Sequence, residues 1–164
     1  TCIGAGHVLL DGRRFSRVLL DEATQATEPA SLVPLVRGAR QIVLVGDHRQ
    51  LPPTVISQRA EKGGLRRSLF ERLAKMGIEP MLLDTQYRMH PAISAFPNET
   101  FYEGRLIDGI EAAERPAPAG LLWNDWEAPI VFLPLKGGEV LSPDGASKEN
   151  PAEAGWIARL LEGL

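Results

Sequence analysis

The chain has 164 residues, a formal net charge of −3, 44% hydrophobic residues and one cysteine. This length allows one or two domains of ordinary globular composition, and the single Cys2 excludes an internal disulfide framework. The acidic balance argues against a polybasic coat for nucleic acid, although a local basic groove stays open, and no apolar run is long enough to predict a transmembrane helix.

The first half of the chain predicts a strand–helix–strand unit. Apolar runs at residues 17–20 and 41–45 predict strands, and both runs are continuous, which is typical of strands buried on both faces. Between them, Glu28 and Pro29 mark a helix start and Gly38 marks its end. Two strands joined by a helix over such a short stretch predict a parallel sheet.

The middle of the chain predicts two further helices separated by a strand. Ser68 and Glu71 have the spacing of a capping box at the start of a helix. The apolar residues 81–83 predict a strand. Pro91 then opens a short helix that closes near Pro97.

The last part of the chain predicts one strand and one helix between loops. Residues 111–120 and 136–150 have the composition of surface loops, and residues 130–133 predict a strand. Asn150 caps a final helix together with Glu153. The apolar side of that helix is predicted to carry Ile157, Leu160, Leu161 and Leu164.

Acidic side chains follow both strands of the first predicted unit. Asp21 and Glu22 follow the first strand, and Gly46-Asp47 follows the second, at the strand ends where open α/β sheets bind ligands. A strand followed by Asp-Glu is typical of nucleotide hydrolases, in which the first acid holds magnesium and the second orients or deprotonates the attacking water. Gln50 would hold the γ-phosphate or that water by its amide. The structural alternative is that these acids are only turn or helix-entry residues.

The QYRMHP stretch, residues 86–91, directly follows the predicted third strand. Tyr87 offers a flat ring that stacks on a base, and the guanidinium of Arg88 matches a phosphate and neutralises charge on a transferred phosphoryl group. The alternative interpretation is a helix cap, with His90 before the helix and Pro91 in its first turn.

Six stretches of the chain, taken together, resemble the up-frameshift-type superfamily-one helicases, the regulators of nonsense transcripts. They occur in the family's order and cover most of the chain. The resemblance implies an α/β fold made of parts of two RecA-like P-loop NTPase domains with parallel sheets, incomplete at both ends. Residues 1–79 would belong to the first domain and residues 80–164 to the second. The stretches are TCIGAG, VLLDEATQATEPASLVPLV, QIVLVGDHRQLPPTV, SLFERL, LDTQYRMHPAISAFPNETFYEGRL and SKENPAEA.

The resemblance also implies roles in the first domain around ATP and magnesium. Asp21 would coordinate the magnesium ion, and Glu22 would activate the attacking water. Gly46, Asp47 and Gln50 would form the motif that couples the state of the γ-phosphate to the grip on nucleic acid.

In the second domain, the resemblance implies that Tyr87 stacks on the adenine and that Arg88 reaches the γ-phosphate. Thr1 would lie near the nucleic-acid backbone. The implied activity is that of an ATP-dependent helicase of the nonsense-mediated mRNA decay type, which moves along single-stranded nucleic acid, RNA being favoured over DNA. The implied location is the cytoplasm, with the nucleus as the alternative. No membrane is implied, and the protein partners stay unknown.

One motif of the family does not occur in the chain. No Gly-x-x-x-x-Gly-Lys-Ser/Thr loop is found, and no Gly is followed by Lys. That loop holds the phosphates and magnesium, so the chain alone is expected to be inactive although the parent protein is an ATP hydrolase. The alternatives are a catalytically inert truncated module and a DNA-directed or transcription-terminating helicase relative. An unrelated P-loop hydrolase is disfavoured because GDHRQLPP and QYRMHP occur together.

Overall fold

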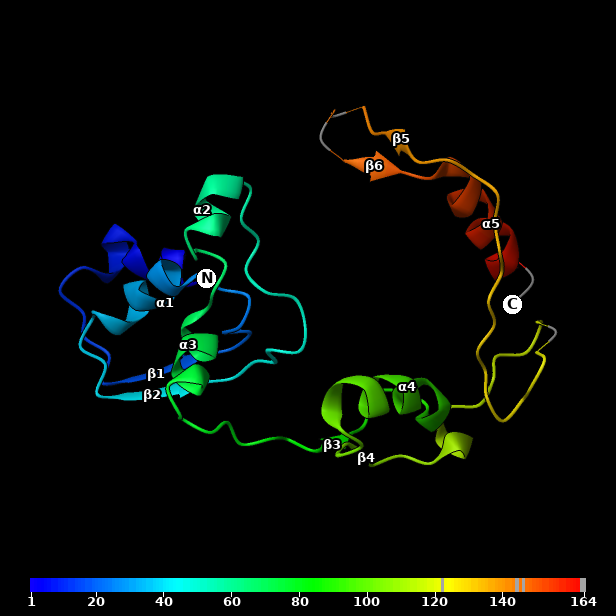
Figure 1. Ribbon diagram of the computed structural model, residues 1–164, viewed down its shortest axis with the longest axis horizontal. Helices are drawn as coiled ribbons and strands as arrows, with labels where there is room; N and C mark the ends of the chain where they lie inside the picture. The colour runs from blue at the N-terminus through cyan, green and yellow to red at the C-terminus, as the bar shows by residue number, and fades with distance from the viewer. Residues whose placement is uncertain (122, 144, 146, 163–164) are drawn as a thin grey trace. The chain divides into compact units, whose positions relative to one another are not determined.

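The chain folds into two compact units, Thr1–Leu82 and Leu83–Leu164 (Figure 1). The computed structural model describes residues 1–164 except 122, 144, 146 and 163–164. Both units pair short parallel strands with helices, which makes the fold α/β. Among the helices that the structure describes, none has both the length and the apolar character needed to cross a bilayer.

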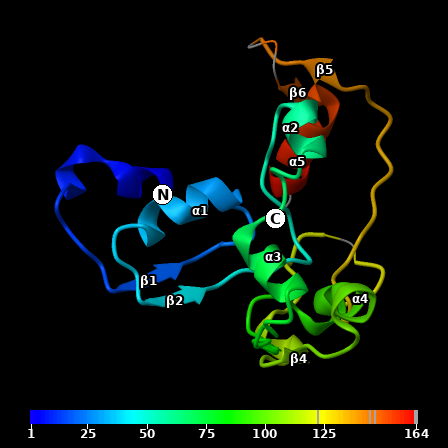
Figure 2. The same ribbon diagram turned by 60° about the vertical axis from the view of Figure 1, so that its left-hand side comes forward.

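The first unit is built on a two-stranded parallel sheet. Strand β1 (Arg17–Leu20) pairs with strand β2 (Gln41–Leu44), and Leu20 lies opposite Leu44. Helix α1 (Glu28–Leu35) connects the two strands, and Figure 2 shows the strands side by side with α1 above them. The predicted strand–helix–strand unit with a parallel sheet is therefore confirmed.

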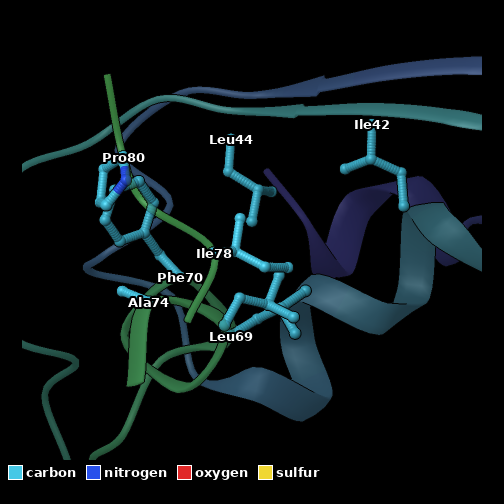
Figure 3. A pocket seen from close by; sticks show the side chains of 8 residues that line it. Ile42, Leu44, Leu69, Phe70, Ala74, Ile78 and Pro80 are labelled. Carbon is cyan, nitrogen blue, oxygen red and sulfur yellow. The ribbon is translucent and has the colours of Figure 1, made fainter. Parts of the chain in front are cut away.

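The sheet of the first unit is only partly buried, and even on the face that carries Leu44 (Figure 3), Ile42 is 48% exposed. Successive side chains of a strand point to opposite faces. Leu20 is 7% exposed, whereas its neighbour Leu19 is 65% and Val43 is 53% exposed. Figure 3 shows Leu44 pointing from β2 toward helix α3 (Leu69–Lys75). The prediction that both faces are buried is wrong, because only alternate side chains of these apolar runs face the helices.

Helix α3 begins where its cap predicts. The hydroxyl of Ser68 accepts a hydrogen bond from the backbone N–H of Glu71 at 3.1 Å. The carboxylate of Glu71 pairs with Nζ of Lys75 at 2.5 Å instead of closing the predicted capping box. The remaining short helical segments are helix α2 (Gln58–Lys62) and the 3-10 turns η1 (Ile3–Gly6), η2 (Val8–Leu10) and η3 (Ala112–Glu114).

The second unit begins with another strand–helix–strand arrangement. Strand β3 (Thr85–Gln86) pairs in parallel with β4 (Ile107–Asp108), and helix α4 (Pro91–Tyr102) lies between them in the chain. The side-chain amide of Asn98 in α4 binds both the N–H and the carbonyl oxygen of Leu106, at 2.8 and 2.9 Å. This pair of hydrogen bonds fixes the approach of the chain to β4.

The predicted helix end near Pro97 and two predicted strands beyond residue 80 are wrong. Helix α4 continues through Pro97, whose missing N–H removes one helical hydrogen bond without ending the helix. Residues 81–83 and 130–133 are not strands. Met81 and Phe132 are instead 90% and 86% exposed. An apolar run becomes a strand only where a second backbone pairs with it.

The end of the second unit holds a hairpin and a helix. Strand β5 (Val140–Leu141) pairs antiparallel with β6 (Lys148–Glu149), in a region predicted to be loop. Helix α5 (Pro151–Glu162) begins after Asn150 as predicted, and Oδ1 of Asn150 accepts a hydrogen bond from Glu153 N at 3.3 Å. Predictions on residues 144 and 146 of the loop and on Leu164 of the helix fall outside the described residues.

Candidate functional site

The turn after β1 presents two exposed acidic residues at the carboxyl end of the sheet. Oδ1 of Asp21 accepts a hydrogen bond from the N–H of Glu22 at 3.0 Å, and Oε2 of Glu22 accepts one from Nε2 of Gln25 at 3.1 Å. Glu22 has a φ of 51°, in the left-handed region that non-glycine residues rarely adopt. Such a backbone persists where the surrounding structure enforces it, and it is enriched at functional sites.

Gly46 lies directly against this acidic turn. The ladder between the strands continues past their ends, with Val45 N donating to Leu20 O and Ala23 N donating to Val45 O, each at 2.8 Å. A Cβ atom on Gly46 would lie 3.0 Å from the backbone nitrogen of Thr24, which is tighter than ordinary contacts. The glycine therefore allows the segment that carries Asp47 to pass close beside the segment that carries Glu22.

The loop after Gly46 is held by its own aspartate. Oδ1 of Asp47 accepts a hydrogen bond from Arg49 N at 2.9 Å, and Oδ2 accepts one from Nε2 of Gln50 at 2.8 Å. The ring of His48 stacks on Phe70 of α3, with 6.0 Å between centroids. Asp47 thus fixes the Gln50 amide within the loop, while His48 connects the loop to α3.

The first unit therefore places Asp21, Glu22, Gly46 and Asp47 after the carboxyl ends of its two paired strands. Magnesium in nucleotide enzymes is held by one or two carboxylates, with substrate phosphates and waters as further ligands. The Asp21 carboxylate fits this role, because its Oδ2 accepts no hydrogen bond from the described residues. The described part of the chain holds no group of three or more His, Cys, Asp or Glu suited to a metal. A magnesium ion held by Asp21 would take phosphate oxygens and waters as its other ligands.

An apolar hollow of about 290 Å³ lies between β2 and α3 and is separate from these acids (Figure 3). Side chains such as Leu44, Leu69 and Phe70 line it. Such walls offer neither hydrogen-bond donors nor positive charge, which phosphate recognition requires. The hollow belongs to the packing of the first unit and is not a phosphate site.

In the second unit, Tyr87 and Arg88 lie on an exposed turn between β3 and α4. The Tyr87 side chain is 64% exposed, and the Arg88 guanidinium forms no ion pair within the described residues. The ring nitrogen Nδ1 of the buried His90 accepts a hydrogen bond from Ala92 N at 3.0 Å. The capping interpretation is therefore correct for His90. The side chains of Tyr87 and Arg88 take no part in the cap and are accessible to a ligand.

A hydrogen-bonded cluster beside this turn, in which Ser94 is buried and Asp108 is exposed, was not predicted from the sequence. Oδ1 of Asp108 accepts hydrogen bonds from Oγ of Ser94 at 2.6 Å and from Nε2 of Gln86 at 2.5 Å. These two hydrogen bonds, the Ser94 one first, hold the pKa of Asp108 below its usual value, so its carboxylate is charged at neutral pH. The partners are 14 and 22 residues apart from Asp108, and no local pattern predicts such a contact.

A second unpredicted interaction joins the helices of the first unit. The guanidinium of Arg72 in α3 binds the carboxylate of Glu28 in α1, with N–O distances of 2.7–2.9 Å. This hydrogen-bonded pair lowers the pKa of Glu28 and raises that of Arg72. The pair is structural, because it fixes the start of α1 rather than facing the acidic turn.

Thr1 is exposed at the start of the first unit. Its hydroxyl accepts a hydrogen bond from Gly4 N at 3.0 Å, a contact within the first turn of the chain. The role of Thr1 at a nucleic-acid backbone stays a prediction.

Two family models match the chain, and both are described as an AAA domain. One matches residues 1–58 and the other residues 65–164. Together they cover both compact units, and the second alone covers more than half of the chain.

Curated relatives are similar to the chain over nearly its whole length. The "Regulator of nonsense transcripts 1 homolog" of Neurospora crassa is 45% identical over 98% of this chain, which covers 15% of that protein. The "ATP-dependent helicase NAM7" of Saccharomyces cerevisiae is 44% identical over 100% of the chain and is covered to 17%. The "5'-3' DNA helicase ZGRF1" of Mus musculus is 42% identical over 100% of the chain and is covered to 9%. The chain thus spans less than a fifth of each of these relatives.

Proposed function

The chain belongs to the AAA domain family, and we propose that it is the part of an ATP-dependent helicase that carries several of its nucleotide-contacting residues. The predicted resemblance to the regulators of nonsense transcripts is confirmed, since proteins of that name are 44–46% identical over nearly the whole chain. In this proposal, residues 1–79 and 80–164 are parts of two RecA-like domains. ATP hydrolysis by the full-length protein drives movement along a single strand of nucleic acid.

The first unit would bind the metal and activate water. Asp21 would hold magnesium, which when bound neutralises phosphate charge and orients the γ-phosphate. Glu22 would accept the proton of the attacking water, because a carboxylate within reach of that water acts as a general base. Gln50, positioned by Asp47, would contact the γ-phosphate or that water and so report whether hydrolysis has occurred.

The second unit would supply an aromatic ring that stacks on the adenine and an arginine that contacts the γ-phosphate. Tyr87 would stack on the adenine, since its ring is largely exposed. Arg88 would reach the γ-phosphate, where a planar guanidinium stabilises the charge of phosphoryl transfer. The absence of an ion pair for Arg88 within the described residues supports this role, because the cation is not already neutralised.

One observation carries the proposal more than any other. Gly46 packs against the backbone of Ala23 and Thr24, so two segments far apart in sequence present their polar side chains at one sheet edge. Ligands of open α/β sheets bind at that edge. A set of turn residues without a shared function would not require this close approach.

RNA is the proposed substrate, and single-stranded DNA is the second candidate. RNA is favoured by the relatives named as regulators of nonsense transcripts. DNA is supported by the mouse relative that is named as a 5'-3' DNA helicase. The proposed location is the cytoplasm, with the nucleus as the alternative.

We expect purified residues 1–164 to hydrolyse ATP only at the background rate, with or without single-stranded RNA. The sequence holds no phosphate-binding loop of the Gly-x-x-x-x-Gly-Lys-Ser/Thr type, which cradles the triphosphate. The full-length protein that contains the chain is expected to hydrolyse ATP faster when single-stranded RNA is added. A colorimetric phosphate assay measures both rates.

Two outcomes would contradict this expectation. Turnover by residues 1–164 that disappears on Glu22→Gln would show that the chain is a complete hydrolase. A full-length protein whose ATP hydrolysis is insensitive to both single-stranded RNA and single-stranded DNA would contradict a helicase.

A further inference from the structure

The exposed turn that carries Tyr87 and Arg88 is held by one side chain behind it. Oε1 of Gln86 accepts hydrogen bonds from Arg88 N at 2.9 Å and Met89 N at 2.8 Å, and its Nε2 donates to Met89 O at 2.8 Å. A carboxamide has two acceptor sites on oxygen and two N–H donors. These three bonds use both acceptor sites and one donor, so one N–H of the Gln86 side-chain amide is left for a partner outside the turn.

That remaining N–H goes to Asp108, which connects the turn to α4. Oδ1 of Asp108 accepts from Nε2 of Gln86 and also from Oγ of Ser94, which is 2% exposed. The Ser94 hydroxyl also lies 3.0 Å from Pro91 O, but it has one hydrogen, and the shorter distance and negative charge favour Asp108. The chain of bonds thus runs from the exposed turn through β4 into the buried side of the helix.

The ring of Tyr87 is placed by a neighbouring glycine of the same strand pair. Gly109 N donates to Gln86 O at 2.8 Å, and any Cβ on Gly109 would overlap the Tyr87 ring. Nη2 of Arg115 donates to the carbonyl oxygen of Tyr87 at 3.3 Å. The backbone on both sides of the Arg88 side chain is therefore bonded to groups outside the turn.

We propose that Gln86, Asp108 and Ser94 form a positioning cluster that fixes the Tyr87–Met89 backbone and thereby directs Arg88 at the γ-phosphate. The inference rests on the proposed function, in which Arg88 contacts that phosphate. None of the three side chains touches the nucleotide in this account. They act by removing backbone freedom from the arginine, because misplacement of a charge-stabilising group by about 1 Å costs roughly 10²-fold in rate.

The test is a double-mutant cycle in the full-length protein, with ATP turnover measured in the presence of single-stranded RNA. Gln86→Leu keeps the size of the side chain and removes all its hydrogen bonds. We expect it to lower kcat roughly 10²-fold, with the affinity for RNA unchanged. In an Arg88→Ala background the same change is expected to lower kcat by less than a factor of about 3, because its effect passes through Arg88.

Two matched variants separate positioning from folding. Asp108→Asn keeps an Oδ1 acceptor for both donors and is expected to retain turnover within about threefold, whereas Asp108→Leu removes the acceptor and is expected to behave like Gln86→Leu. Asn150→Ala removes a helix cap from the same unit without touching the turn or β4, so it is expected to lower the thermal midpoint while leaving kcat near the wild-type value.

Each result that differs from the expected one leads to a different conclusion. If Arg88→Ala lowers kcat but Gln86→Leu does not, the positioning cluster is refuted and the proposed function stands. If Gln86→Leu lowers kcat equally in both backgrounds, the residue acts on overall stability and the inference is wrong. If Arg88→Ala itself leaves kcat unchanged, the proposed function of the arginine fails first.

Discussion

Arg88→Ala in the full-length protein is expected to lower ATP turnover by about 10³-fold while leaving the affinity for single-stranded nucleic acid close to that of the wild type. The guanidinium would stabilise charge that develops on the transferred phosphoryl group, so its loss raises the barrier rather than weakening the grip on the strand. Steady-state phosphate release and fluorescence anisotropy of a labelled RNA measure the two quantities separately.

Arg88→Lys distinguishes the shape of the guanidinium from its charge. Lysine keeps the positive charge but lacks the planar fork that binds two oxygen atoms at once. We expect this variant to recover only part of the lost turnover. Arg88→Ala with undiminished turnover, or with RNA affinity reduced as strongly as turnover, would remove Arg88 from the proposed role.

Glu22→Gln is expected to lower turnover by about 10²- to 10⁴-fold, the range that a general base contributes, while ATP binding is retained. Glutamine has the size of glutamate and can keep the hydrogen bond with Gln25, so the left-handed turn at this position is preserved. Only the ability to accept a proton is lost. Single-turnover hydrolysis and equilibrium binding of a fluorescent ATP analogue measure the two effects.

Glu71→Gln is the matched control for this variant. Glu71 is an acid of helix α3 in the same unit, and it pairs with Lys75 at 2.5 Å. Its change is expected to leave turnover within about twofold, in line with the small contribution of a surface ion pair. Equal losses in both variants would mean that turnover responds to general charge changes and not to a base at Glu22.

The sequence alone predicts the parts of this fold that depend on local chemistry. The aliphatic runs before Asp21 and Gly46 become paired parallel strands, and Ser68 and Asn150 cap helices because a short polar side chain satisfies a free N–H at a helix start. The family is also predictable, because the matching stretches are long and occur in a fixed order.

Elements that depend on a distant partner were predicted poorly. Residues 81–83 and 130–133 have the composition of strands but no paired backbone, whereas β5 and β6 are each only two residues long and are defined by pairing with each other. Pro97 does not end helix α4, which continues to Tyr102. Composition does not contain this information, because pairing is a tertiary property.

In the candidate site, too, some features are predictable from the sequence and others are seen only in the structure. The sequence places acids after both strands, and the structure adds why they meet, through the close approach of Gly46 to Thr24. The left-handed φ of Glu22 has no sequence signature, since glutamate rarely adopts it. The hydrogen bonds between Gln86 and Asp108 span 22 residues, so only coordinates reveal that the arginine turn has a supporting cluster.

The most direct test is equilibrium binding of ATP and of ADP to the full-length protein carrying Glu22→Gln, which prevents turnover during the titration. Two side chains of the second unit are proposed to contact the nucleotide, Tyr87 at the adenine and Arg88 at the γ-phosphate. Tyr87→Ala is then expected to weaken the binding of ATP and of ADP by similar factors. Arg88→Ala is expected to weaken the binding of ATP more than the binding of ADP. If both changes leave both affinities at the value of the Glu22→Gln protein, the second unit does not contact the nucleotide and the account is contradicted.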